Sequence, residues 1–67
     1  MARYTGDTPF RETVTDGIRG GEFVLRTDKG ELRLKARPPV NDLVNARTDD
    51  GRMVTIDLND PENITIS

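Results

Sequence analysis

The chain alternates apolar and polar residues in short runs, which is the pattern of strands that bury one face. The clearest run spans residues 31–37, where Leu32, Leu34 and Ala36 alternate with charged side chains. Four other runs show the same alternation: residues 22–27, 43–48 and 52–58, and a short final run with Ile64 and Ile66. We expect each run to form a strand whose apolar residues face a core.

A five-residue near-repeat separates these runs. Arg26-Thr27-Asp28-Lys29-Gly30 returns 21 residues later as Arg47-Thr48-Asp49-Asp50-Gly51. In a short hairpin loop, an Asp begins the turn by accepting hydrogen bonds from backbone amides ahead of it. The Gly then adopts the left-handed conformation that costs other residues energy. The repeat therefore predicts two β-hairpins within an antiparallel meander.

The pattern before the first hairpin is weaker. Residues 10–15 follow Pro9 and contain β-branched Thr and Val, so we expect a short strand there that ends at Asp16-Gly17. Residues 1–8 are polar and show no periodicity. We expect them to form a flexible N-terminal arm before a single domain over residues 9–67.

Five or six short strands with turns every 8–12 residues are typical of a small closed β-fold. We therefore expect an all-β domain, a small SH3-like barrel or roll of five to six short antiparallel strands. Residues 39–46 leave an alternative open, because Val40, Leu43 and Val44 also have helical spacing. A short helix at 39–46 would favour an OB-like barrel.

The composition argues against an enzyme. The chain has 67 residues with no cysteine and no histidine, so it lacks the commonest neutral-pH general base and the commonest metal ligand. Nucleophile-elbow, phosphate-loop and dinucleotide motifs are also missing. Residues 57–62 contain several side-chain oxygens of the kind that binds calcium, but they lack the glycine and the 12-residue loop of an EF-hand. We therefore interpret them as a polar turn. We expect no catalytic residue, cofactor or metal site.

Basic side chains are concentrated in the middle of the chain. Arg33, Lys35 and Arg37 alternate on one strand face at spacings of about 6–7 Å. The candidate binding residues are this trio and two neighbours across the turn: Arg26, Lys29, Arg33, Lys35 and Arg37. Such a strip could bind a phosphate backbone or a carboxylate-rich protein segment.

Three functional hypotheses follow from these features. The net charge of −2 and the scarcity of aromatic residues disfavour a nucleic-acid binder, so a protein–protein interaction or regulatory accessory module is favoured. One alternative is nucleic-acid binding through the basic strand face 26–37, and the other is a homo-oligomeric structural subunit. No run is long enough to span a membrane, and the absence of cysteine favours a cytoplasmic location.

Overall fold

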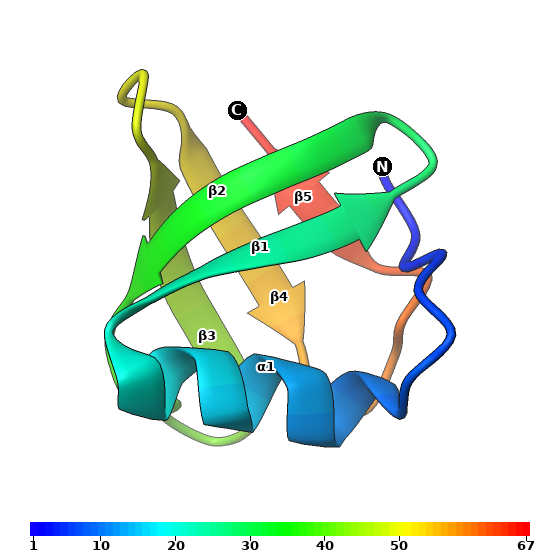
Figure 1. The fold of residues 1–67 in the computed structure, drawn as a ribbon, viewed down its shortest axis with the longest axis horizontal. Coiled ribbons are helices and arrows are strands. Elements are labelled where there is room, and N and C mark those ends of the chain that lie inside the picture. Colours follow the sequence, from blue (N-terminus) through cyan, green and yellow to red (C-terminus); the bar gives the residue numbers. More distant parts are fainter.

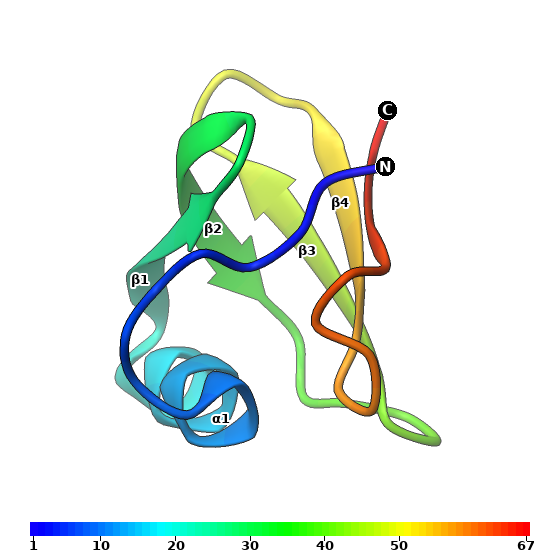
Figure 2. The same cartoon turned by 90° about the vertical axis from the view of Figure 1, so that its right-hand side faces the viewer.

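The computed structural model describes residues 1–67 as one helix followed by five strands (Figure 1). The elements are α1 (Phe10–Gly20), β1 (Glu22–Thr27), β2 (Gly30–Ala36), β3 (Leu43–Thr48), β4 (Met53–Asp57) and β5 (Ile64–Ile66). Each strand pairs antiparallel with the next, in the order β1-β2-β3-β4-β5. The sheet curls on itself, and α1 lies at one end of the curl (Figures 1 and 2). The predicted small barrel or roll of antiparallel strands is confirmed.

The inner face of the curled sheet forms the core. The strands alternate buried and exposed residues, as their sequences predict, and β3 follows the alternation without a break. The fully buried large side chains are Val14, Leu25, Leu34, Val44, Val54, Ile56 and Ile64. All but Val14 belong to strands, so the sheet supplies most of the apolar burial that stabilises this small domain.

The alternative helix over residues 39–46 is wrong. Leu43 already belongs to β3, and the N–H and C=O groups of Val40 and Leu43 bond each other at 2.9 and 3.0 Å. Between them Asn41 and Asp42 adopt positive φ angles of 52° and 63°. Asn and Asp tolerate this conformation, which a tight two-residue hairpin turn requires. The turn therefore replaces the helix.

The predicted strand over residues 10–15 is also wrong, because α1 spans Phe10–Gly20. Phe10, Val14 and Ile18 recur every fourth residue, so a helix places all three on one face. Val14 is fully buried, and Phe10 and Ile18 pack against the core beside it. The β-branched Thr and Val residues suggested a strand, but burial of this apolar face outweighs their weak local preference.

Gly17 is required where α1 crosses β1. A Cβ atom added at Gly17 would lie 2.3 Å from Cγ and 2.7 Å from Cβ of Phe23. Alanine normally stabilises a helix interior by roughly 1 kcal/mol relative to glycine. Here we expect the overlap to dominate, and G17A to lower the free energy of unfolding by about 1–2 kcal/mol.

Gly20 provides the matched control, because it lies on the same helix and a Cβ there meets nothing within 4 Å. G20A should leave stability unchanged or raise it by about 0.5–1 kcal/mol. Urea denaturation followed by circular dichroism measures both variants. Equal stabilities for G17A and G20A would refute the close packing of α1 on Phe23.

Both predicted hairpins are present, but threonine rather than aspartate organises their turns. The Thr27 hydroxyl accepts a hydrogen bond from the Lys29 N–H at 3.1 Å and donates to the Gly30 carbonyl at 2.8 Å. The Thr48 hydroxyl accepts from the Arg52 N–H at 2.8 Å. Both threonines are buried. A buried hydroxyl needs hydrogen-bond partners, and both turns supply them, which gives threonine the same structural role in both copies of the repeat.

Residues 1–8 are docked on the barrel, whereas the sequence favours a loose arm. The N–H and C=O groups of Ala2 bond Ile64 of β5 at 2.7 and 3.0 Å. On the other side, the Thr5 N–H donates to the Arg26 carbonyl of β1 at 3.0 Å. The arm therefore bridges the two terminal strands of the sheet and closes the gap between them (Figure 2).

Asp28 fixes the arm from the tip of the first hairpin. Its carboxylate accepts the Arg3 N–H at 2.9 Å, and the Asp28 N–H donates to the Arg3 carbonyl at 3.0 Å. The hydrogen bond from the Arg3 backbone lowers the pKa of the Asp28 carboxyl, so this group stays ionised at neutral pH. Asp28 thus joins the arm to the hairpin instead of bonding the amides of its own turn.

Candidate functional site

Four cationic side chains gather on the outer face of β2 and β3. We name Arg33, Lys35, Arg37 and Arg47 the basic cluster; all four are exposed. Lys35 and Arg47 are direct cross-strand partners, and the Arg37 N–H donates to the Asn45 carbonyl at 3.2 Å. Strand alternation keeps all four on the same side of the sheet.

No side chain of the basic cluster forms an ion pair with a carboxylate. The chain contains 10 Lys and Arg residues, and five outside the cluster lie within 4.0 Å of a carboxylate. These pairs are Arg3–Asp28, Arg11–Asp42, Arg19–Asp16, Arg26–Glu31 and Arg52–Asp50. None of the four cluster residues forms such a pair. Like charges directly opposite each other destabilise a sheet. The Lys35–Arg47 pair therefore lowers the stability of the unliganded protein, and a bound anion would offset this loss.

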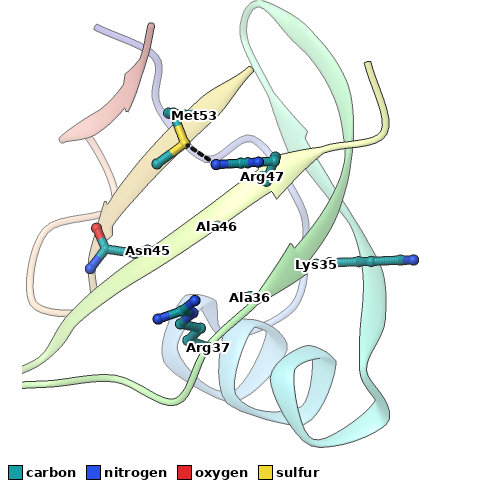
Figure 3. A pocket seen from close by; sticks show the side chains of 7 residues that line it. All are labelled: Lys35, Ala36, Arg37, Asn45, Ala46, Arg47 and Met53. Atoms are coloured by element: carbon teal, nitrogen blue, oxygen red, sulfur yellow. Dashed lines mark hydrogen bonds between the residues drawn. The ribbon is translucent and has the colours of Figure 1, made fainter. Parts of the chain in front are cut away.

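A shallow hollow of about 600 Å³ lies within the cluster. Lys35, Arg37 and Arg47 line it together with Asn45 and Met53, and no carboxylate contributes. Figure 3 shows the Arg47 side chain turned toward Met53, with Nη2 3.3 Å from Sδ. In the same view Lys35 extends away from this contact. The hollow therefore presents cationic and amide donors together with three apolar side chains, those of Met53, Ala36 and Ala46.

Two acidic residues border the cluster without neutralising it. Glu22 is the cross-strand partner of Lys35 on β1, and Asp49 follows β3 in the second hairpin turn. A second hollow, of about 350 Å³, is lined by Glu22, Arg33, Lys35, Arg47, Thr48 and Asp49. Neither carboxylate comes within 4.0 Å of a cationic nitrogen. Three cationic side chains therefore line this hollow against two carboxylates, and all five side chains are exposed to solvent.

Apolar side chains flank the cluster. Val24 on β1 is the cross-strand partner of Arg33, and Met53 on β4 is the partner of Arg47. Both are close to half exposed, at 47% and 46%. The outer face is therefore a band of cations with an exposed apolar side chain on either side.

No aromatic side chain belongs to this face. The rings of Tyr4 and Phe10 contact each other at the start of α1, with centroids 5.2 Å apart and planes tilted by 47°, and Phe23 packs over Gly17. Hydrogen bonds with the hydroxyls of Thr13 and then Thr8 lower the pKa of Tyr4. All three aromatic residues pack against the core, so the basic cluster has no platform for stacking nucleobases.

The structure brings together three of the five residues that the sequence predicts as a binding strip. Arg33 and Lys35 lie on the outer face of β2, and Arg37 directly follows the end of this strand. Arg26 is held by Glu31 at 3.4 Å, and Lys29 lies at the hairpin tip, about 20 Å along the strand from Lys35. The strip is thus shorter along β2 than predicted and extends sideways onto β3.

Arg47, the member of the cluster from β3, was not among the predicted binding residues. The sequence does place Arg47 on the outer face, because side chains alternate along a strand and Val44 and Ala46 occupy the apolar, inward positions. What the sequence did not supply was the register that sets Arg47 opposite Lys35. The two residues are 12 positions apart in the chain, and only the pairing of β2 with β3 makes them neighbours.

No family model, curated protein or solved structure matches this chain. Its single helix is also neither long nor apolar enough to cross a membrane.

The acidic residues elsewhere serve local structure. The Asp57 carboxylate accepts the Asn59 N–H at 2.9 Å, and that of Asp60 accepts the Glu62 N–H at 3.0 Å, as expected of a polar turn. Asn59 and then Arg11 hydrogen-bond the Asp42 carboxylate and lower its pKa, which ties α1 to the turn before β3. No three acidic residues are grouped to hold a metal ion.

Asp50 supports the second hairpin in the same way. Its carboxylate accepts hydrogen bonds from the Thr48 hydroxyl and from Nε of Arg52, and these bonds lower the pKa of Asp50, with the Thr48 bond having the larger effect. The side chain is thereby committed to its own turn.

Proposed function

We propose that this protein is a non-enzymatic interaction module whose basic cluster binds an acidic segment of a protein partner. The observation that carries the proposal is the cross-strand pair of Lys35 and Arg47, flanked by Arg33 and Arg37, because none of these four side chains lies within 4.0 Å of a carboxylate. A carboxylate bound between them replaces like-charge repulsion with charge-assisted hydrogen bonds. Guanidinium groups suit this role because their planar fork can grip a carboxylate with two parallel bonds.

The surroundings of the cluster favour a protein over a nucleic acid. Val24 and Met53 supply exposed apolar surface on both sides, which contributes to protein recognition and not to phosphate binding. The aromatic residues pack elsewhere, so no ring on this face can stack on a nucleobase. The absence of cysteine supports a cytoplasmic setting for this module.

Calorimetric titration with a synthetic peptide tests the proposal. The probe is a blocked peptide of about eight residues that alternates Glu and Thr, and its control replaces every Glu with Gln. We expect the Glu peptide to bind with an affinity that decreases as salt increases, because exposed charges are screened. We expect the Gln peptide not to bind.

A single-stranded oligonucleotide of matched charge decides between the two classes of partner. Under the protein-binding proposal the oligonucleotide binds more weakly than the Glu peptide, because its charged backbone makes no favourable contact with the apolar side chains of Val24 and Met53. Tighter binding of the oligonucleotide would instead favour the nucleic-acid alternative. Equal, negligible heats with every probe would refute the basic cluster as an anion-binding surface.

A further inference from the structure

Strand β2 has an open edge next to the basic cluster. Its pairing with β1 runs continuously from Gly30 to Lys35, but its pairing with β3 covers only Leu34 to Ala36. Residues 30–33 therefore have a strand neighbour on one side alone. The end of β3 at Thr48 and the turn that follows it leave the other side without a partner strand.

The direction of the unpaired backbone groups follows from the ladder. The Arg37 N–H donates to Asn45 of β3, so groups of every second residue back along β2 point to that same side. Lys35 meets Arg47 there. Glu31 and Arg33 come next, beyond the end of β3, and their N–H and C=O groups face the open side. The edge thus offers two donors and two acceptors to an extended chain.

The charges beside this edge fit an acidic occupant. Arg33 lies on the edge itself, and Lys35 and Arg47 continue the positive charge toward β3. Glu22, Glu31 and Asp49 are the acidic residues in the vicinity, and Glu31 is already paired with Arg26. The three cations exceed the two carboxylates that remain, so electrostatic complementarity selects a negatively charged segment.

We infer that an extended acidic segment of the partner adds as a further strand to the open edge of β2. This inference rests on the proposed function and specifies its binding mode. The partner backbone bonds Glu31 and Arg33, and its outward side chains carry carboxylates to Arg33, Lys35 and Arg47. Because side chains alternate along a strand, the recognised sequence has an acidic residue at every second position.

Amide hydrogen exchange followed by NMR tests this mode with the Glu–Thr peptide. At about ten times the Kd of the peptide, the amides of Glu31 and Arg33 should exchange about tenfold more slowly, because only the unbound fraction exchanges. The Lys35 amide is the internal control. It is bonded to β3 already, so its protection should change much less.

Peptides N-methylated at every second residue give an independent test in the two possible frames. A peptide methylated in the frame that bonds β2 should lose at least about tenfold in affinity, whereas methylation in the other frame should have little effect. Binding in which Glu31 and Arg33 gain no protection and both frames behave alike would overturn strand addition and leave the proposed function intact. Absence of binding by the unmethylated peptide would overturn both. Protection that grows with protein concentration alone would identify a second copy as the occupant and also overturn the inference.

Discussion

Deleting residues 1–5 should destabilise the domain by about 3–7 kcal/mol, because five backbone hydrogen bonds are lost at about 0.5–1.5 kcal/mol each. Four of them join Ala2, Arg3 or Thr5 to β1, β5 or the first hairpin, and one joins Tyr4 to Pro61. The deletion also removes Ala2, which is buried in the core. A domain of this size has a total stability of only about 3–10 kcal/mol, so a large fraction of molecules should unfold.

Thermal unfolding followed by circular dichroism measures this effect. Arg3→Ala is the matched control, because it removes the exposed ion pair with Asp28 and keeps every backbone bond of the arm. Exposed ion pairs contribute about 0–1 kcal/mol, so this variant should melt close to the parent protein. A truncated protein that melts at the parent temperature would show that the arm does not close the barrel.

Arg47→Glu should weaken binding of the acidic peptide while making the free protein more stable. The substitution converts the like-charged Lys35–Arg47 pair into an opposite-charged one, which we expect to stabilise the fold by about 0.2–1 kcal/mol. It also places a carboxylate in the hollow that the partner's carboxylate must enter. We expect the Kd of the Glu–Thr peptide to rise by at least about tenfold, as expected for loss of a charged hydrogen bond of about 1.5–3 kcal/mol.

Arg19→Glu is the control for net charge, since it changes the charge of the protein by the same amount on α1. Its side chain is 82% exposed and lies in the last helical turn, where a basic residue is favourable. This variant should bind the peptide within about twofold of the parent and be slightly less stable. If both variants weaken binding equally, the peptide responds to overall charge and not to the basic cluster.

In R47E, peptide affinity and protein stability should change in opposite directions. Replacing a residue that serves folding lowers the stability of the protein, whereas replacing a residue that serves binding can raise it. Arg47 is expected to show the second behaviour, because its favourable partner is missing from the chain. A loss of stability in R47E would therefore identify Arg47 as a structural residue.

The sequence predicts the strands of this fold well and its helix poorly. Along residues 31–37 every second side chain is apolar, and burial on one face enforces that register in the structure. For α1 the decisive signal was the four-residue spacing of Phe10, Val14 and Ile18. That spacing is sparse in an eleven-residue segment interrupted by Gly17, and the β-branched residues between suggested a strand. Gly17 marks close contact with Phe23, and not a turn.

The candidate site could be predicted only in part, because the sequence determines which face of a strand a residue occupies but not its cross-strand neighbours. Alternation places Arg33, Lys35 and Arg37 on one face from sequence alone, but it says nothing about which carboxylates reach them. Arg26 looked equivalent and proves to be paired with Glu31, whereas Arg47 was overlooked and completes the cluster. Cross-strand register decides both outcomes, and register depends on turn geometry and long-range packing.

Chemical-shift mapping with the Glu–Thr peptide tests the central claim most directly. In a ¹⁵N-labelled sample, we expect the peptide to shift amide signals of β2, of β3 near Arg47 and of Met53, and to leave those of α1 in place. The same titration with the Gln peptide should shift none of them. Shifts confined to α1 or to the 57–62 turn, or no shifts at saturating peptide, would contradict the claim that the basic cluster is the binding surface of this protein.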